Sequence, residues 1–141
     1  MKRRAVDRTA LITGGLGLIG SFIARRLVEH GVVDRAVLLD HYGRDVDSTR
    51  PEFVDYRKLR RLGIEAHMVL ERGEAKYYSV IQDLINRYRP AYIFHLADLP
   101  LAKLQNLNTQ EAQEGSVVST SILLEVIGHL KRDDGYEPDR F

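Results

Sequence analysis

The chain has 141 residues, of which 44% are hydrophobic and 29% are charged, a composition typical of one soluble globular domain. Its 21 basic and 20 acidic residues leave a formal net charge of +1, so we expect no broad electrostatic binding to nucleic acid or to an anionic membrane. Cysteine is absent, which excludes a disulfide scaffold, a thiolate metal site and a cysteine nucleophile.

Strands and helices are predicted to alternate along the first half of the chain. The apolar run Thr9–Thr13 predicts a buried strand, and Leu18–His30 carries apolar residues on one helical face. Ala36–Asp40 predicts a second strand. A polar loop then leads to a capping-box pattern at Thr49–Glu52, which opens a helix that ends near Leu62.

The same alternation continues in the second half. Glu65–Leu70 predicts a third strand, and Tyr77–Arg89 has the apolar spacing of a helix. Ala91–Ala97 predicts a fourth strand. A long helix is expected from Asn108 or Thr109 to Leu130, and the charged residues 131–141 predict a loop or tail.

Strands that are separated by helices pair in parallel through right-handed crossovers. We therefore expect one α/β domain over residues 1–141, a Rossmann-like, doubly wound parallel sheet truncated after about four strands. No apolar run approaches the roughly 18 residues that a membrane span needs. The N-terminal Met-Lys-Arg-Arg is not followed by an apolar segment, so we expect a cytoplasmic protein without a signal peptide.

A glycine-rich turn joins the first strand to the first helix. Residues 13–20 read T-G-G-L-G-L-I-G, in which Gly15, Gly17 and Gly20 have the G-x-G-x-x-G spacing of dinucleotide-binding turns. Gly17 would let a pyrophosphate approach the backbone, and Gly20 would let the helix pack closely on the strand. The start of the helix would present its N–H groups to the phosphates. No Lys-Ser or Lys-Thr follows, so this is not a triphosphate P-loop.

A ligand-free turn is the alternative, although four glycines in seven residues would then cost backbone entropy without a compensating contact. Asp40 ends the second strand, where a dinucleotide fold places the acid that accepts hydrogen bonds from the adenosine ribose. Because this carboxylate would repel a 2′-phosphate, we expect NAD rather than NADP. Arg44 and Arg50 in the next loop could hold such a phosphate, and Asp40 could instead cap a turn.

These motifs resemble those of the extended short-chain dehydrogenases/reductases, in particular the NAD-dependent epimerases and dehydratases that act on nucleotide sugars. The resemblance covers essentially the whole chain and is strongest in the glycine turn and in Leu38-Leu39-Asp40. It implies that Glu74 contacts the adenine amino group. It also implies that the strand end at Leu96 and Ala97 runs beside the cofactor.

The chain departs from the family's pattern at several positions. Glu74 replaces the usual Asp, and Asp98 replaces the second Ala of the H-x-A-A motif. Asp98 is either a functional group near the nicotinamide or a polar residue at a strand exit. In the helix that is similar to N-V-x-G-T-x-N-L-L-E, Ser116 replaces Asn, Ser119 replaces Gly and Ile122 replaces Asn.

The resemblance also implies catalytic residues that this chain lacks: a tyrosine four residues before a lysine, and a Ser or Thr after a fifth strand. None of the seven tyrosines has a lysine four places later. The final Arg140-Phe141 is similar to the pair that begins the family's fifth strand, so the fourth strand is expected to have an unpaired edge. We expect His95 to pack and hydrogen-bond rather than to act as an acid or base.

The sequence therefore predicts the NAD-binding portion of a nucleotide-sugar epimerase or dehydratase, inactive alone, with nucleotide sugar bound only by an intact relative. The alternative is a naturally short, non-enzymatic NAD(H)-sensing or partner-binding module. The helix over residues 109–130 has more apolar positions than one stripe needs, and in the family that surface is the dimer interface. No catalytic or metal-ligating residue is assigned, and the candidate cofactor-binding residues are Gly14, Gly15, Gly17, Leu18, Ile19, Asp40, His41, Arg44, Glu74, Leu96 and Ala97.

Overall fold

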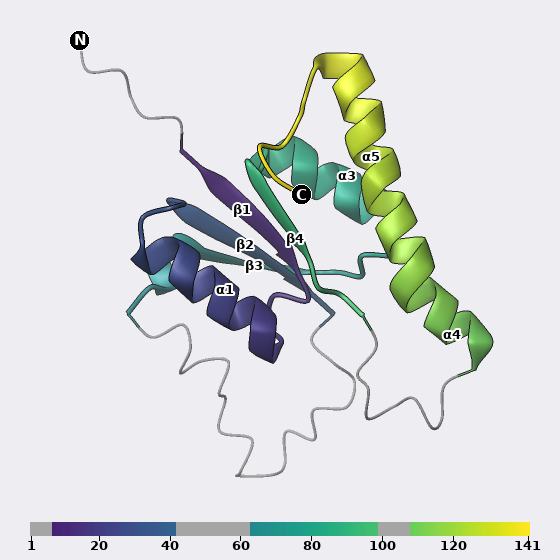
Figure 1. Ribbon diagram of the computed structural model, residues 1–141, viewed down its shortest axis with the longest axis horizontal. Coiled ribbons are helices and arrows are strands. Elements are labelled where there is room, and N and C mark those ends of the chain that lie inside the picture. The colour runs from purple at the N-terminus through teal and green to yellow at the C-terminus, as the bar shows by residue number, and fades with distance from the viewer. Residues whose placement is uncertain (1–6, 42–62, 99–107) are drawn as a thin grey trace.

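Four parallel strands form the centre of the chain, whose computed structural model describes residues 7–41, 63–98 and 108–141 (Figure 1). Their order across the sheet is β3-β2-β1-β4. The strands are β1 (Thr9–Thr13), β2 (Arg35–Asp40), β3 (Met68–Arg72) and β4 (Tyr92–His95). This order confirms the predicted α/β class with a Rossmann-like, doubly wound sheet, because the chain leaves β1 toward β2 and returns to its other side at β4.

Helices cover both faces of this sheet. In Figure 1, α1 (Leu18–Glu29) lies on one side, and α3 (Tyr78–Tyr88) and α5 (Ser119–Asp134) lie on the other. All five residues of β1 are buried, which is the pattern of a strand that is covered from both faces.

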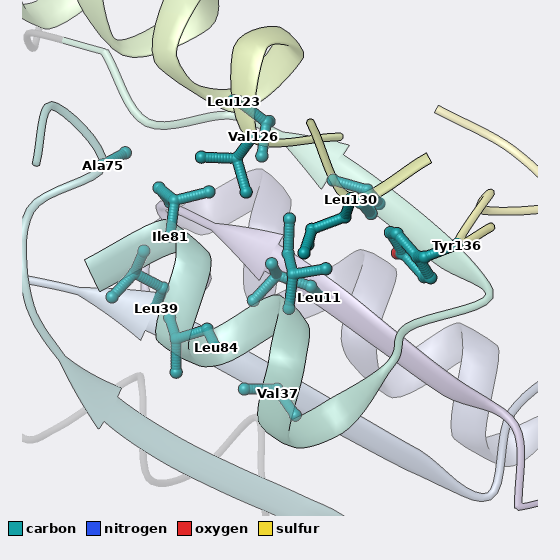
Figure 2. Packing of buried hydrophobic residues seen from close by; sticks show 12 residues of the cluster. Leu11, Val37, Leu39, Ala75, Ile81, Leu84, Leu123, Val126, Leu130 and Tyr136 are labelled. Carbon is teal, nitrogen blue, oxygen red and sulfur yellow. The ribbon is translucent and has the colours of Figure 1, made fainter. Parts of the chain in front are cut away.

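The alternation of side chains along each strand divides the core into two clusters. Leu11, Val37 and Leu39 belong to the cluster on the α3 and α5 side, which Figure 2 shows together with Ile81, Leu84 and Val126. Ala10, Ile12, Ala36 and Leu38 belong to the second cluster, with Ala24 of α1. The two faces of the sheet therefore hold two separate apolar layers.

The C-terminal helical region differs from the single helix that the sequence predicts. It consists of α4 (Thr109–Gln113), a π-helical turn η4 (Glu114–Val118) and α5. Helix α5 continues four residues beyond Leu130, to Asp134, and Gly135 ends it in the left-handed conformation with φ +73°. Residues 131–134 are thus helical rather than part of a loop, because Lys131 and Arg132 suit the last turn of a helix and Gly135 provides its cap.

The segment after α5 is also more ordered in its contacts than a charged tail predicts. Tyr136 is buried and its hydroxyl donates to the carbonyl oxygen of Pro90 at 2.8 Å. The N–H of Ile93 donates to the carbonyl of Arg140, and Tyr92 and Arg140 form a parallel bridge. The outer edge of β4 is therefore partly paired, in contrast to the expected unpaired edge.

Two further expectations need comment. The third strand begins three residues later than predicted, because Glu65–His67 form a short 3-10 turn before β3. The predicted helix over residues 49–62 and the candidate residue Arg44 lie outside the described residues.

Candidate functional site

The glycine turn links the ends of three neighbouring strands. Gly14 has φ +67°, and a Cβ there would lie 2.8 Å from the carbonyl oxygen of Leu96, just after β4. A Cβ on Gly15 would lie 2.8 Å from the Cβ of Leu38 in β2. Consecutive glycines thus pack against the two strands on either side of β1, and only glycine fits this turn without moving the backbone.

Helix α1 begins directly after this turn, with Gly17 in an extended conformation at its N-cap. A Cβ on Gly20 would lie 2.5 Å from the carbonyl oxygen of Gly14, so the first turn of the helix packs on the glycine turn. The first N–H groups of a helix have no partner within it and carry the positive end of the dipole. Leu18 and Ile19, in this first turn, are 62% and 64% exposed, so an anion can reach this backbone.

Asp40 stands beside the glycine turn at the end of β2. Its Oδ2 accepts a hydrogen bond of 3.1 Å from the N–H of Leu16, and its Oδ1 lies 3.1 Å from Nδ1 of His41. The Asp40 side chain is 13% exposed, whereas that of His41 is 62% exposed. The carboxylate is therefore fixed at the edge of the glycine turn.

A chain of hydrogen bonds runs from β1 through β4 to α5. The N–H groups of Leu96 and Ala97 each donate to Oγ1 of Thr13 at 3.1 Å. The hydroxyl of Ser119 donates to the carbonyl of Gly115, so it accepts from Nε2 of His95, and Nδ1 of His95 accepts the hydrogen of the Thr13 hydroxyl, 2.7 Å away. Nε2 of His95 then carries the ring hydrogen and donates to Oγ of Ser119 at 3.2 Å.

This chain of bonds fits only a neutral imidazole, since Nδ1 must accept. Burial lowers the pKa of His95 below its ordinary value, and the Asp98 carboxylate acts weakly in the opposite direction. The hydroxyl of Ser119 in turn donates a hydrogen bond of 2.5 Å to the carbonyl of Gly115 in η4. His95 therefore orients the strand end and the helix, the hydrogen-bonding role that the sequence predicts for it.

Glu74, the expected adenine contact, lies two residues after β3 in an ionic bridge. Nζ of Lys76 lies 3.1 Å from Oε2 of Glu74 and 2.8 Å from Oε2 of Glu114 in η4. The pKa of Lys76 is raised, first by its hydrogen bonds to Glu114 and Glu74, and the pKa of Glu114 is lowered by the bond from Lys76. An open hollow of about 400 Å³ beside this bridge is lined by Lys76, Tyr77, Glu114 and Val118.

Three positions where the chain departs from the family's pattern form direct contacts, which the sequence analysis missed. The hydroxyl of Ser116 donates to Oδ1 of Asp98 at 2.7 Å, and Ser119 accepts from His95 as described above. The π-helical turn η4 contains Ser116 and places it opposite the end of β4. The signal in the sequence was the pairing of the substitutions: a carboxylate replaces Ala on one segment and a hydroxyl replaces Asn on the other.

The structure gathers most of the predicted residues at the carboxyl edge of the sheet. Gly14, Gly15, Asp40, Leu96 and Ala97 meet around the end of β1, and α1 begins there with Gly17, Leu18 and Ile19. Within the described ranges, no group of three or more His, Asp or Glu side chains could hold a metal ion. No helix among these residues is long and apolar enough to cross a membrane.

Comparison with known proteins identifies the family. Residues 11–138 match the sequence profile of the GDP-mannose 4,6 dehydratase family. The chain belongs to this family of NAD-dependent epimerases and dehydratases. It is 26% identical over 127 residues to a CDP-glucose 4,6-dehydratase of Salmonella typhimurium, and that match covers 88% of the chain and 32% of the relative.

Solved structures of epimerases share the fold. A UDP-glucose 4-epimerase of Thermus thermophilus in complex with NAD has a TM-score of 0.63 at 21% identity, over 92% of this chain and 35% of the epimerase. One from Bifidobacterium longum in complex with NAD+ and UDP has a TM-score of 0.65 at 18% identity, over 86% of this chain and 33% of the epimerase. The chain thus spans about a third of the length of these relatives.

Proposed function

We propose that this chain binds NAD at the carboxyl edge of its sheet, as the cofactor-binding portion of a nucleotide-sugar epimerase or dehydratase. The observation that carries the proposal is the contact between the glycine turn and Asp40, with the N–H of Leu16 donating to the carboxylate. This contact brings the start of α1 and a ribose-binding acid together in the arrangement that a dinucleotide requires. Structural relatives crystallised with NAD support the same cofactor.

The residues present fit the two halves of an adenosine diphosphate group. The exposed first turn of α1 offers N–H groups to the pyrophosphate, and Asp40 accepts from ribose hydroxyls. Glu74, which is 43% exposed in its bridge with Lys76, lies past β3, where the adenine would extend. Gly14, Gly15, Gly17, Leu18, Ile19, His41, Leu96 and Ala97 complete the proposed cofactor site.

We further propose that the 141-residue chain alone converts no nucleotide sugar. When bound, NAD supplies a hydride acceptor. The proton of the sugar hydroxyl would still need a base, and no tyrosine of this chain stands four residues before a lysine. Nucleotide-sugar binding is accordingly assigned to intact relatives and not to this chain.

Titration calorimetry with NAD and NADP tests the proposal. We expect NAD to bind and NADP to bind at least tenfold more weakly, because Asp40 would face the 2′-phosphate. The absence of heat with both ligands, from protein with a cooperative unfolding transition, would contradict cofactor binding. Tighter binding of NADP would contradict the role of Asp40, and turnover of a nucleotide sugar by the purified chain would contradict the proposed inactivity.

A further inference from the structure

Two carboxylates flank the glycine turn, one on each side of β1. Thr13, the last residue of β1, pairs with Leu39 of β2 on one side and with His95 of β4 on the other. Adjacent strands lie about 4.8 Å apart, so the backbones of Leu39 and His95 are about 10 Å apart across β1. Asp40 follows Leu39 directly, and Asp98 follows His95 by three residues.

The glycine turn connects these two flanks. Gly14 packs against the backbone of Leu96 and Ala97, and Gly15 packs against Leu38 and donates from its N–H to the carbonyl of Leu39 at 3.2 Å. A dinucleotide that places its pyrophosphate at the start of α1 and its first ribose at Asp40 crosses the sheet where the strand order reverses. Its second ribose then lies on the β4 side, where Asp98 stands.

Asp98 is exposed, and its carboxylate accepts a hydrogen bond from the helical region. Its Oδ1 accepts the hydroxyl of Ser116 at 2.7 Å, from the π-helical turn η4. An ionised carboxylate has two oxygens and about four acceptor positions, the acceptor geometry that both hydroxyls of a diol require. Carboxylate bonds to hydroxyl groups are charge-assisted and are among the stronger hydrogen bonds.

We propose that Asp98 is a second ribose-binding carboxylate, which accepts hydrogen bonds from the hydroxyls of the ribose on the nicotinamide side of the bound dinucleotide. Ser116 is its positioning residue. The inference rests on the proposed NAD binding and adds a residue to it: Asp40 binds one ribose and Asp98 binds the other. It also explains why the Ala-to-Asp and Asn-to-Ser departures from the family's motifs contact each other.

The affinities of three ligands, compared with one another, distinguish the second ribose contact from the other contacts of the site. ADP has one ribose, ADP-ribose has both riboses without nicotinamide, and NAD has all of these groups. In Asp98→Ala, we expect the affinities for NAD and for ADP-ribose, each divided by that for ADP, to fall about tenfold. The ratios remove the general effect of deleting a negative charge near a phosphate.

Two further variants complete the experiment. Ser116→Ala keeps the carboxylate but loses its support, so we expect the same ratios to fall by a smaller factor, about threefold. Asp133→Ala is the charge-matched control, because Asp133 is an exposed acid in the last turn of α5, at the opposite edge of the sheet, and should leave both ratios unchanged. Thermal unfolding of each variant verifies that it is folded.

The outcomes are distinct. Ratios unchanged in Asp98→Ala, with ADP still bound, contradict the second ribose contact and leave the proposed function standing. A fall for NAD without a fall for ADP-ribose assigns Asp98 to the nicotinamide and also contradicts the proposal. If the natural chain binds none of the three ligands, the proposed function fails and the second ribose contact fails with it.

Discussion

The N–H of Leu16 donates a 3.1 Å hydrogen bond to the carboxylate of Asp40, so the acid at the end of β2 also fixes the conformation of the glycine turn. A side chain that supports the turn and also selects the cofactor should respond differently to two substitutions. Asparagine keeps the acceptor oxygen and removes the charge, whereas alanine removes both. The comparison therefore separates support of the turn from selection of the cofactor.

We expect the free energy of unfolding of Asp40→Asn to lie within about 1 kcal/mol of that of the natural chain. Its affinity for NADP, divided by that for NAD, should rise about tenfold, because the repulsion of a 2′-phosphate is gone. Asp40→Ala should lose a further 1–2 kcal/mol or so of stability, since the N–H of Leu16 loses its acceptor. Calorimetry with both cofactors and urea unfolding measure these effects. An unchanged NADP-to-NAD ratio in Asp40→Asn would contradict the selective role of the charge.

Substitution by alanine should destabilise the chain far more at Gly14 than at Gly31, a glycine with a similar backbone conformation. Gly14 has φ +67° and Gly31 has φ +63°, but a Cβ on Gly31 meets nothing within 4 Å, whereas one on Gly14 lies 2.8 Å from the carbonyl oxygen of Leu96. Gly31→Ala should cost about 1–2 kcal/mol, the ordinary penalty of the left-handed region. Gly14→Ala should cost about 2 kcal/mol more, because the backbone of Leu96 and Ala97, just after β4, must shift. Equal costs in urea unfolding would show that the turn can move away from β4.

Local patterns were sufficient to predict the sheet and the glycine turn. Thr9–Thr13 and Ala36–Asp40 are apolar runs bounded by polar or glycine residues, and parallel pairing follows from the helices between them. The glycine spacing identified the start of α1 because its requirement is local: a close approach between Gly20 and Gly14. The family then followed from motifs contained within these same segments.

The contacts that the sequence did not predict depend on partners distant in the chain. The charged residues around Tyr136 predict a loop, which is correct for this position, but they do not indicate that Tyr136 is buried and donates to the carbonyl of Pro90, 46 positions earlier. Arg89 supports it with hydrogen bonds of 2.7 and 3.1 Å to Asp134 and lies 4.6 Å from the centre of the Tyr136 ring. The π-helical turn η4 was missed because its apolar spacing continues that of an α-helix.

His95 should remain neutral to lower pH than an ordinary histidine. Burial lowers its pKa in the folded chain, while in the unfolded chain the pKa stays near 6.5. Below about pH 6.5 the unfolded state therefore binds more protons, and the contribution of His95 to stability is lost as the pH falls. Well above that pH the contribution is complete and constant.

Two measurements test this direction of the pH dependence. Nitrogen chemical shifts should show the Nε2–H tautomer of His95, which donates to Ser119, and a titration midpoint below the ordinary value. The free energy of unfolding of the natural chain, minus that of His95→Asn, should shrink between about pH 7 and about pH 5. A difference that grows on acidification would mean that the protonated ring is the form held by the fold.

A homodimer that forms through the helical region after β4 is the remaining expectation. Val117 in η4 and Leu124 in α5 are 63% and 50% exposed, and they lie seven residues apart, which places them on one side of a helix. Leu123 and Val126 on the other side are buried against the sheet, so the outer residues are not needed for the fold of the chain. A second copy that packs on them would bury this apolar side.

We accordingly expect the natural chain to elute as a dimer in chromatography with light scattering and Leu124→Glu to elute as a monomer, since the introduced carboxylate would have to be buried without a partner. Val32→Glu is the matched control: Val32 is an exposed valine after α1, and this substitution should leave the dimer intact. Because Leu124 is half exposed, the monomeric variant should unfold like the natural chain at concentrations where that chain is also dissociated. A natural chain that is monomeric at every concentration, or a Leu124→Glu dimer, would assign the apolar side of this helix to another role.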